Sequence, residues 1–253
     1  MLFSKEFNEK VVLVTGGSSG IGKATALIFA QEGAKVVVAG RRVAEGEQTV
    51  HEICEIGGDA IFVKTDVSKA SEIEALVNKT VDIYGRLDCA FNNAGVAKIA
   101  SLINSSEEDW EYTLNINLKG TWLSMKYEIA EMLKHGRGAI VNMASVAGVT
   151  GIAHTSIYSA SKGGIIALTK AIAIEYAKSG IRINVVSPAT IHTLALNELL
   201  PANQLDKFII DNPNPIGRLG TPYEVGEAVK WLCSDKASFI TGHNLMIDGG
   251  YTA

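Results

Sequence analysis

The chain has 253 residues, 47% of them hydrophobic and 20% charged, and its formal net charge is −4 at pH 7. This length and composition predict one globular α/β domain over residues 1–253, and the mild acidity, with no Lys/Arg run longer than two, argues against a nucleic-acid-binding surface. No stretch approaches the roughly 18 apolar residues of a membrane span, and the first residues lack a signal-peptide core, so we expect a cytoplasmic protein that binds no membrane.

Short apolar runs alternate along the chain with longer segments of helical periodicity. The runs expected to be strands are Val11–Thr15, Lys35–Ala39, Ala60–Lys64, Leu87–Phe91, Ala139–Met143, Ile183–Val186 and Asn244–Ile247. Continuous runs of Val, Ile, Leu and Phe are typical of parallel strands that are buried on both faces. The expected helices are Gly22–Gln31, Val43–Ile56, Ala70–Tyr84, Glu107–Leu133, Ile157–Ala177 and Pro222–Leu232. Repeated strand–helix–strand units predict a single Rossmann-like, doubly wound parallel sheet flanked by helices.

Several expected helices carry signals at their ends. Ser106 with Asp109, and Thr221 with Glu224, form capping patterns at two helix starts. Glycines that should end helices stand at Gly33, Gly57, Gly85 and Gly180.

The segment from about 190 to 218 interrupts this alternation. It holds Pro201, Pro213 and Pro215, with helix-like stretches near 194–200 and 204–210. A long insertion after a strand is often a lid over a substrate site, and we expect a lid here. A plain surface excursion is the alternative.

The cysteines Cys54, Cys89 and Cys233 share no spacing typical of a metal site, and the five histidines form no ligand motif. We therefore expect buried free thiols in a reducing compartment and no bound metal.

A glycine-rich loop, Gly16-Gly-Ser-Ser-Gly-Ile-Gly22, follows the first expected strand and opens the first expected helix. Glycines allow a tight turn and let the backbone approach a pyrophosphate. The helix N-terminus adds free N–H groups and a partial positive charge. This setting predicts a dinucleotide site, and the loop residues expected to contact the cofactor are Gly16, Ser18, Ser19, Gly20, Ile21 and Gly22.

Tyr158 and Lys162 are four residues apart and so share one face of an expected helix. A nearby ammonium favours phenolate and lowers the pKa of a tyrosine, which would make Tyr158 a general acid or base near neutral pH. Such a pair alone is more often a solvated helix face. Combined with the glycine-rich loop, it suggests hydride transfer to or from a carbonyl.

From about residue 10 to residue 250, these motifs follow the order and spacing of the short-chain dehydrogenase/reductase family, and the chain resembles its compact branch, whose members have roughly this length. The resemblance implies a catalytic tetrad of Asn117, Ser145, Tyr158 and Lys162. Ser145 would stabilise charge on the substrate oxygen, and Lys162 would also hold the nicotinamide ribose. Asn117 would hold a water of a proton relay, and Asn115 is the competing candidate.

The resemblance also extends the expected cofactor site to other strand ends. The further contacts that it implies are Asp66, Val67, Asn92, Ala94, Gly95, Pro188, Ile191 and Thr193, besides Tyr158 and Lys162. Ala189 stands where the family usually has glycine, and it would be strained if the backbone there needed a positive φ. We expect the replacement to be tolerated.

The end of the second expected strand bears on the choice of cofactor. A carboxylate there bonds the ribose 2′-hydroxyl of NAD, but this chain has Gly40, followed by Arg41 and Arg42. An arginine can hold a 2′-phosphate bidentately. We therefore favour NADP(H), with NAD(H) possible, because the arginines could instead be solvated or pair with Glu45 or Glu47.

We expect an NAD(P)(H)-dependent oxidoreductase that interconverts a carbonyl and a secondary alcohol, with Tyr158 as acid/base. The alternatives are an NAD-dependent dehydrogenase of a secondary alcohol or cyclic diol and, from another class, a non-catalytic nucleotide-binding regulator. The expected substrate pocket is lined by the lid and by Val146, Ala147, Gly151, Ile152 and His154. The resemblance further implies a homotetramer, built on the Glu107–Leu133 and Ile157–Ala177 helices and the C-terminal strand region.

Overall fold

The computed structural model describes residues 5–193, 196 and 214–253. In this part of the chain one seven-stranded sheet runs through the centre, in the order β3-β2-β1-β4-β5-β6-β7, and all neighbouring strands are parallel. The strands are β1 (Val11–Thr15), β2 (Lys35–Gly40), β3 (Asp59–Lys64), β4 (Cys89–Asn92), β5 (Gly138–Met143), β6 (Ile181–Pro188) and β7 (Asn244–Ile247). The predicted doubly wound parallel sheet is therefore confirmed, with each strand at its expected place.

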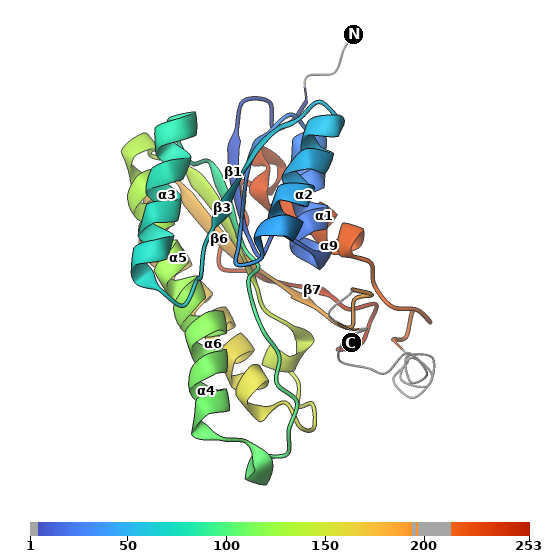
Figure 1. Ribbon diagram of the computed structural model, residues 1–253. Coiled ribbons are helices and arrows are strands. Elements are labelled where there is room, and N and C mark those ends of the chain that lie inside the picture. Colours follow the sequence, from blue (N-terminus) through green and yellow to red (C-terminus); the bar gives the residue numbers. More distant parts are fainter. Residues whose placement is uncertain (1–4, 194–195, 197–213) are drawn as a thin grey trace.

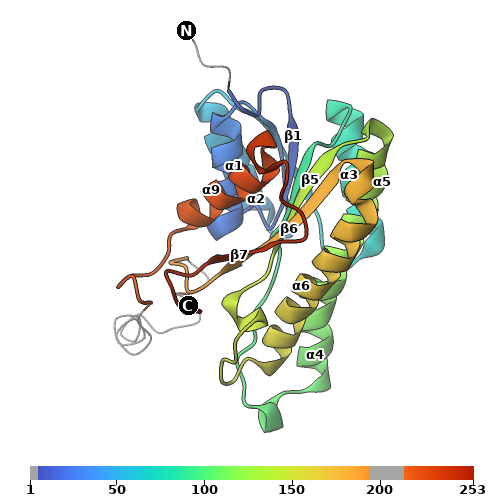
Figure 2. The ribbon, with the colours of Figure 1, turned by 180° about the vertical axis from the view of Figure 1, so that it is seen from behind.

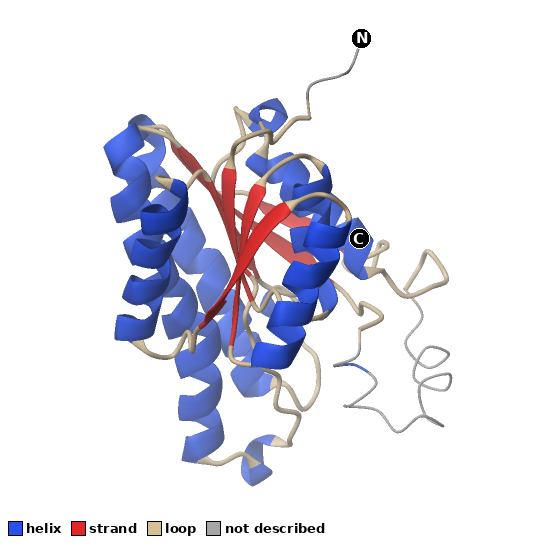
Figure 3. Cartoon of the chain, turned by 45° about the horizontal axis from the view of Figure 1, so that its top comes forward, coloured by secondary structure: helices blue, strands red, loops and turns tan. Residues whose placement is uncertain are grey.

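Helices cover both faces of the sheet and give the three layers seen in Figures 1 and 3. One face carries α1 (Gly20–Gln31), α2 (Val43–Glu55) and α9 (Pro222–Cys233). The other face carries α3 (Ala70–Tyr84), α5 (Gly120–Met132) and α6 (Ser156–Tyr176). Helix α4 (Glu107–Leu114) extends beyond the sheet beside α6, as Figure 2 shows from behind.

Alternate residues of each strand pack into two separate apolar layers. Val12 and Val14 of β1 face the side of α1, where they join Phe29, whereas Leu13 faces the other side and joins Met125 of α5. Successive side chains of a strand point to opposite faces. Continuous apolar strands are needed because both faces are covered.

The expected helix ends are confirmed. The Ser106 hydroxyl accepts a hydrogen bond from the Asp109 amide, and Thr221 and Glu224 form a reciprocal capping box at the start of α9. Positive φ angles occur at the glycines that end helices, Gly33, Gly57, Gly85 and Gly180. Among the described residues, positive φ outside glycine occurs only at Glu9 and His154. Ala189 is therefore unstrained, as expected.

The expectation of one continuous helix over Glu107–Leu133 is wrong in its middle. A π-helical turn, Asn115–Lys119, separates α4 from α5. The Asn117 side chain is drawn to the backbone of Val96, and the Thr121 hydroxyl donates to the Asn117 carbonyl at 2.7 Å. Because the bonds to Val96 join Asn117 to a distant segment, the periodicity of apolar residues cannot predict them.

The expectation of buried thiols holds for Cys89 and Cys233 but is wrong for Cys54, which is exposed. Helix α2 buries Gly46, Thr49 and Ile53 against the sheet, and Cys54 falls on its other face. All three cysteines are free.

Most of the expected lid, at 194–195 and 197–213, lies outside the described residues. Within the ranges that are described, we find no helix with the length and apolarity needed to cross a membrane. The same ranges contain no group of His, Cys, Asp or Glu side chains arranged to hold a metal ion.

Candidate active site

The glycine-rich loop joins β1 to α1 at the carboxyl edge of the sheet. Gly16 and Gly20 have φ angles of 65° and 54°. A Cβ at Gly22 would lie 2.3 Å from the carbonyl oxygen of Gly16, so only glycine fits there. Ser19 is the N-cap of α1 but makes no side-chain capping bond, so the first amides of the helix have no cap from this hydroxyl. This arrangement fits a bound pyrophosphate.

Asn93 and Thr15, which were not among the predicted site residues, hold this loop to the end of β4. The Asn93 Nδ2 donates to the carbonyls of Thr15 and Gly16 at 3.0 and 3.2 Å. The Thr15 hydroxyl accepts from the amides of Asn93 and Ala94 at 3.0 and 3.2 Å. The Asn-Asn doublet at a strand end was the only available signal for this role.

Asn92 is placed differently from its neighbour. Its Nδ2 donates to Glu128 Oε2 and to Asn142 Oδ1, both at 3.0 Å, within a buried polar cluster between the sheet and α5. This side chain is therefore not directed toward the glycine-rich loop. If Asn92 contacts the cofactor as predicted, the contact must be made by its backbone.

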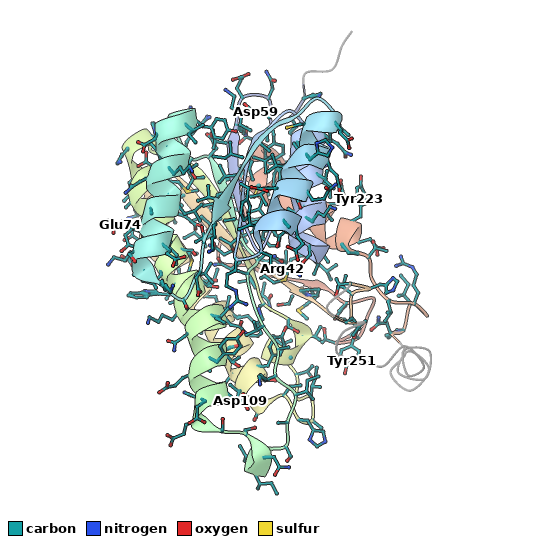
Figure 4. The ribbon with its side chains drawn as sticks, in the orientation of Figure 1. Arg42, Asp59, Glu74, Asp109, Tyr223 and Tyr251 are labelled. Atoms are coloured by element: carbon teal, nitrogen blue, oxygen red, sulfur yellow. The ribbon has the colours of Figure 1, made fainter. Side chains whose placement is uncertain are left out.

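Arg42 lies at the start of α2, at the end facing the carboxyl edge of the sheet (Figure 4). Its Nη2 lies 2.5 Å from the Ser19 hydroxyl, and its Nη1 lies 3.7 Å from Glu45 Oε1. The side chain remains 51% exposed. Gly40 lies beside the same loop, because a Cβ there would be 3.4 Å from the Ser18 hydroxyl. The Arg42 guanidinium, just after β2, therefore lies in contact with the glycine-rich loop.

Arg41 points to a different place, a cavity of about 310 Å³ at the end of β3. The cavity is lined by Arg41, Asp66, Ser68, Tyr112, Asn115, Ile116 and Lys119. Burial raises the pKa of Asp66, but two hydrogen bonds from Ser68 and the charge of Arg41 outweigh burial and hold this pKa below its usual value. An ionised acceptor inside a cavity fits the predicted adenine contact of Asp66. The contributions of Tyr112 and Lys119 were not foreseen, because they come from a helix distant in sequence.

Ser145, Tyr158 and Lys162 come together just beyond the end of β5. The Ser145 hydroxyl accepts from the Ala147 amide at 3.2 Å, and it lies near enough to the Tyr158 phenol to affect the pKa of that group. The Lys162 Nζ lies 5.6 Å from the centre of the Tyr158 ring. Tyr158 is partly buried, whereas Lys162 is only 3% exposed.

The electrostatics of this trio differ from the simple expectation. Burial raises the pKa of Tyr158, and the Ser145 hydroxyl opposes this rise. Burial also lowers the pKa of Lys162 to about 8. The ammonium donates to the carbonyl of Met143 at 2.9 Å and does not contribute to the Tyr158 pKa. The expected lowering of the Tyr158 pKa by Lys162 is therefore not seen here, because burial favours the neutral form of each group.

Asn117 is fully buried in the π-helical turn and adjoins Lys162. A Cβ at Gly95 would lie 3.3 Å from Asn117 Oδ1 and 3.5 Å from Lys162 Nζ, so both side chains flank this glycine. The Asn117 amide bonds the amide and carbonyl of Val96 at 2.8 and 2.9 Å and the Ser161 hydroxyl at 3.0 Å. Asn115 instead lines the cavity of Arg41. Of the two candidates, Asn117 is the one beside the lysine.

The segment after β6 returns to the glycine-rich loop. Thr193 lies close to Gly20, since a Cβ on that glycine would be 3.5 Å from Thr193 Cγ2. Ile191 is buried in the apolar layer on the α1 side and forms a bridge with Gly220. Pro188 is the last residue of β6 and pairs with Ile247. Thr193 is thus well placed for its predicted cofactor contact, whereas Ile191 packs mainly into the core.

The loop between Ser145 and Tyr158 holds the predicted substrate-pocket residues. Val146 and Ala147 are buried, and His154 is exposed with a φ of 65°. The His154 carbonyl accepts from the Ala100 amide at 2.9 Å, which ties this loop to the segment that follows β4.

Comparisons with known proteins decide what this assembly is. A family model described as enoyl-(acyl carrier protein) reductase matches residues 16–252. The solved structure of levodione reductase superposes with a TM-score of 0.92 at 35% identity, covering 96% of this chain and 98% of that one. The chain belongs to the short-chain dehydrogenase/reductase family.

Curated relatives in this family include cyclohexanol dehydrogenase of Acinetobacter sp. (strain SE19), 43% identical over 100% of this chain and 98% of that protein. Another is cis-4-hydroxycyclohexanecarboxylate dehydrogenase of Sinomonas cyclohexanicum, 41% identical over 98% of both chains. A third is 2,5-dichloro-2,5-cyclohexadiene-1,4-diol dehydrogenase of Sphingobium indicum (strain DSM 16412 / CCM 7286 / MTCC 6364 / B90A), 38% identical over 98% of this chain and 99% of that protein.

Membership of the short-chain dehydrogenase/reductase family confirms the resemblance drawn from the sequence motifs. The chain is an oxidoreductase of this family, whose members use NAD(P)(H). The alternative of a non-catalytic regulator is thereby set aside. The roles of individual residues remain predictions.

Proposed function

We propose that this enzyme interconverts a cyclic secondary alcohol and its ketone, with Tyr158 as the acid/base and NADP(H) as the preferred cofactor. The observation that carries the proposal is that the Lys162 ammonium lies 5.6 Å from the centre of the Tyr158 ring, next to Ser145, at the edge of the sheet that also bears the glycine-rich loop. The names of three relatives supply the substrate class, since each refers to a six-membered ring bearing a hydroxyl group.

The trio provides the proton chemistry that such a reaction needs. In reduction Tyr158 gives its proton to the carbonyl oxygen, and in oxidation it takes the proton of the alcohol. Ser145 donates a hydrogen bond to the same oxygen and stabilises the charge that develops there. When bound, the nicotinamide of the cofactor supplies or accepts the hydride. Lys162 would hold the hydroxyls of the nicotinamide ribose and maintain a positive charge near the phenol.

Asn117 would support a proton relay through its backbone rather than its side chain. Its side-chain amide is already engaged by Val96 and Ser161. The carbonyl of Asn117 accepts from Thr121 and keeps a second lone pair. A water on that lone pair, inside the π-helical turn, would link Lys162 to solvent.

The residues present fit a dinucleotide. A Cβ at Gly16 would lie 2.7 Å from Asn93 Nδ2, and one at Gly22 would strike the Gly16 carbonyl, so both glycines keep the backbone of the loop open to a ligand. Gly16, Gly20 and the first amides of α1 would hold the pyrophosphate, and Asp66 would accept from the adenine amino group. Ala94 and Gly95 would line the ribose, and Thr193 would meet the carboxamide.

The preference for NADP(H) rests on Arg42 more than on Arg41. The contact between Arg42 and Ser19 puts a guanidinium beside the glycine-rich loop. Arg42 lies just after β2, whose last residue, Gly40, provides no competing carboxylate. An arginine at that position can hold a 2′-phosphate. Glu45, at 3.7 Å, offers Arg42 a partner of its own. NAD-dependent oxidation of a secondary alcohol or cyclic diol is therefore the second candidate.

Parallel fluorescence titrations with NADPH and NADH, followed by turnover assays, test the proposal. We expect tighter binding of NADPH and turnover of cyclohexanone and cyclohexanol. An open-chain ketone of equal carbon number serves as the control and should react more slowly. Tighter binding of NADH would shift the proposal to the second candidate. Binding without turnover of any cyclic alcohol or ketone would contradict the substrate class.

We further propose a homotetramer in a reducing, cytoplasmic setting. An apolar groove of about 440 Å³ lies between the π-helical turn, α5 and α6, and Trp122 on its wall is 44% exposed. A second copy of the chain that packs its own equivalent helices there would cover this surface. The three free thiols support the reducing compartment. Sedimentation analysis of the parent and of Trp122→Glu tests the assembly, and an unchanged mass for the variant would contradict it.

A further inference from the structure

A carboxyl group is buried between α5 and the sheet, and it has no salt-bridge partner among the residues that the structure describes. Glu128 is 0% exposed, and its Oε2 accepts from Asn92 Nδ2 of β4 at 3.0 Å. Asn92 also donates to Asn142 Oδ1 of β5 at 3.0 Å. Asn142 in turn donates to the Thr169 hydroxyl of α6 at 2.9 Å and contacts the sulfur of Met125 at 3.1 Å. This cluster, made of Asn92, Met125, Glu128, Asn142 and Thr169, joins two strands to two helices.

The cluster lacks one hydrogen-bond donor. An asparagine amide has two N–H groups, and both N–H groups of Asn92 and both of Asn142 are engaged by the contacts just described. Two buried oxygens in the cluster remain without a partner among the described residues, Asn92 Oδ1 and Glu128 Oε1. They belong to the two groups that already share a hydrogen bond. A buried acceptor without a donor destabilises the fold, and one added proton on the acid would give both oxygens a partner.

Exchanging the nitrogen and oxygen of the Asn92 amide does not remove this requirement. The Asn92 oxygen would then stand 3.0 Å from Glu128 Oε2. Two acceptor oxygens at this distance also need a proton between them. In either orientation, all the polar atoms of the Glu128 and Asn92 side chains have hydrogen-bond partners only when Glu128 is protonated.

We propose that Glu128 is a protonated carboxylic acid that pairs with the Asn92 side chain, accepting one hydrogen bond and donating another, and so acts as a positioning residue for the end of β4. The next residue, Asn93, holds the carbonyls of Thr15 and Gly16. The Glu128–Asn92 pair therefore fixes the strand end from which the glycine-rich loop is held. Ionisation of Glu128 would set a carboxylate against the Asn92 oxygen and loosen this strand end.

The surroundings of Glu128 support this assignment. Burial raises the pKa of Glu128 to about 7, and the Asn92 hydrogen bond opposes the rise. In the described part of the chain, no charged group is among the causes of this shift. Besides Glu128, the titratable residues of α5 and of the elements packed against it are Glu72, Glu74, Lys79, Asp82, Tyr84, Cys89, Lys119, Lys126, Tyr127, Glu131, Lys134, His135, Tyr158, Lys162, Lys170, Glu175 and Tyr176.

The protonation state can be observed directly in the full-length protein. Isotope-edited infrared spectroscopy with ¹³C-labelled glutamate should show a protonated carboxylic-acid band at pH 6. The band should disappear in Glu128→Gln and weaken in the parent as the pH rises through about 7. Glu131→Gln removes the next acid on α5, which pairs with Lys134 and His135, and should leave the band intact. A parent protein without this band at pH 6 would overturn the proposal.

Thermal unfolding gives a second, independent readout. A glutamine can donate to Asn92 Oδ1 and accept from Asn92 Nδ2 at every pH, as the protonated acid does. Because the folded pKa of Glu128 lies above its unfolded value, the parent loses stability as pH rises from about 4.5 to about 7, and the loss is constant above that. The Tm of Glu128→Gln should therefore gain on that of the parent across this interval and then stay level. A difference independent of pH, or one that shrinks as pH rises, would contradict the proposal.

The positioning role predicts a third effect, in cofactor binding. The affinity of the parent for NADPH should fall as pH rises through 7, relative to that of Glu128→Gln. This last readout rests on the proposed function, whereas the infrared and unfolding measurements do not. Failure of the binding readout alone would remove the link to the glycine-rich loop, and failure of the infrared band would remove the protonated acid itself.

Discussion

The proposed adenosine end and the proposed catalytic end of the site place their cations in opposite environments. Arg41 and Arg42 are exposed, and Arg42 contacts the hydroxyl of Ser19 and lies near Glu45. Lys162 is 3% exposed, donates to a strand carbonyl, and has its pKa lowered to about 8 by burial. One end thus presents fixed charge to the solvent, and the other holds a proton whose position depends on its surroundings.

This difference in environment suggests that one end determines which cofactor binds and the other carries out proton transfer. A solvated guanidinium keeps its charge under any condition of interest and attracts a phosphate without help from neighbours. A buried ammonium or phenol changes protonation state when burial or a hydrogen bond changes. We therefore expect substitutions at the adenosine end to change which cofactor binds, and substitutions at the catalytic end to change whether the reaction occurs.

The largest effect should come from Tyr158→Phe. Removal of the phenol takes away the proton donor, and kcat should fall by at least about a hundredfold, the lower range for general acid–base catalysis. Cofactor affinity, measured by fluorescence titration, should be nearly unchanged. Tyr176→Phe, at the far end of α6, is the matched control and should keep activity. Near-parental turnover in Tyr158→Phe would remove the assigned acid/base.

Gly22→Ala should come next, through binding rather than proton transfer. The added Cβ would lie 2.3 Å from the Gly16 carbonyl oxygen, so the loop must shift. Overpacking of this kind costs about 1–3 kcal/mol, and we expect the Kd for either cofactor to rise about tenfold. Gly57→Ala, at a helix end with open space around its Cβ, should lower stability and leave the Kd unchanged. Equal Kd values for Gly22→Ala and the parent would contradict the loop assignment.

A smaller and selective effect should follow from Gly40→Asp. A side chain fits at this position, because its Cβ would lie 3.4 Å from the Ser18 hydroxyl. The new carboxylate would repel a 2′-phosphate and accept from a 2′-hydroxyl. The ratio of the NADPH and NADH affinities should move toward NADH, while kcat with saturating cofactor changes little. Gly40→Ala controls for size, and an equal shift in that variant would show that charge is not the cause.

The smallest effect should be a change in stability alone. Thr221→Ala removes half of the capping box of α9, which costs about 1 kcal/mol for a typical N-cap. The pKa of Glu224 is lowered to about 2, mainly by the hydrogen bond from Arg218. The stability from this carboxylate is therefore present above about pH 4.5 and lost as pH falls toward 2. Calorimetry of Thr221→Ala should show a lower Tm, and turnover assays should show an unchanged kcat. A changed kcat would contradict the view that this helix end affects stability alone.

Much of the fold was predictable because the strands are largely apolar and several helix ends have local signals. The strands are buried on both faces, so their sequences read as continuous Val and Ile runs, as in Lys35–Gly40. Capping by Ser106 and Thr221 depends on residues three positions away. Local rules of this kind need no knowledge of the tertiary structure.

The rest depended on contacts between distant segments. In the π-helical turn the Asn117 side chain bonds Val96, a contact between distant segments that no helical pattern records. Asn92 and Asn93 are adjacent and identical, yet one joins Glu128 in the interior and the other holds the glycine-rich loop. Their opposite directions follow from strand geometry, but their partners, Glu128 and Thr15, lie in other parts of the chain.

The π-helical turn between α4 and α5 also constrains which insertions and deletions the chain can accept. A residue in a helix advances the side chains by about 100°, and a π turn holds one residue more than a regular turn. Deleting a single residue from 115–119 would turn this segment into a regular helical turn and leave α4 and α5 in nearly the same register. The backbone inside the turn would change, and Asn117 would lose its contact with Val96. The extra residue of the turn therefore serves the position of Asn117 and not the direction of the helix axis.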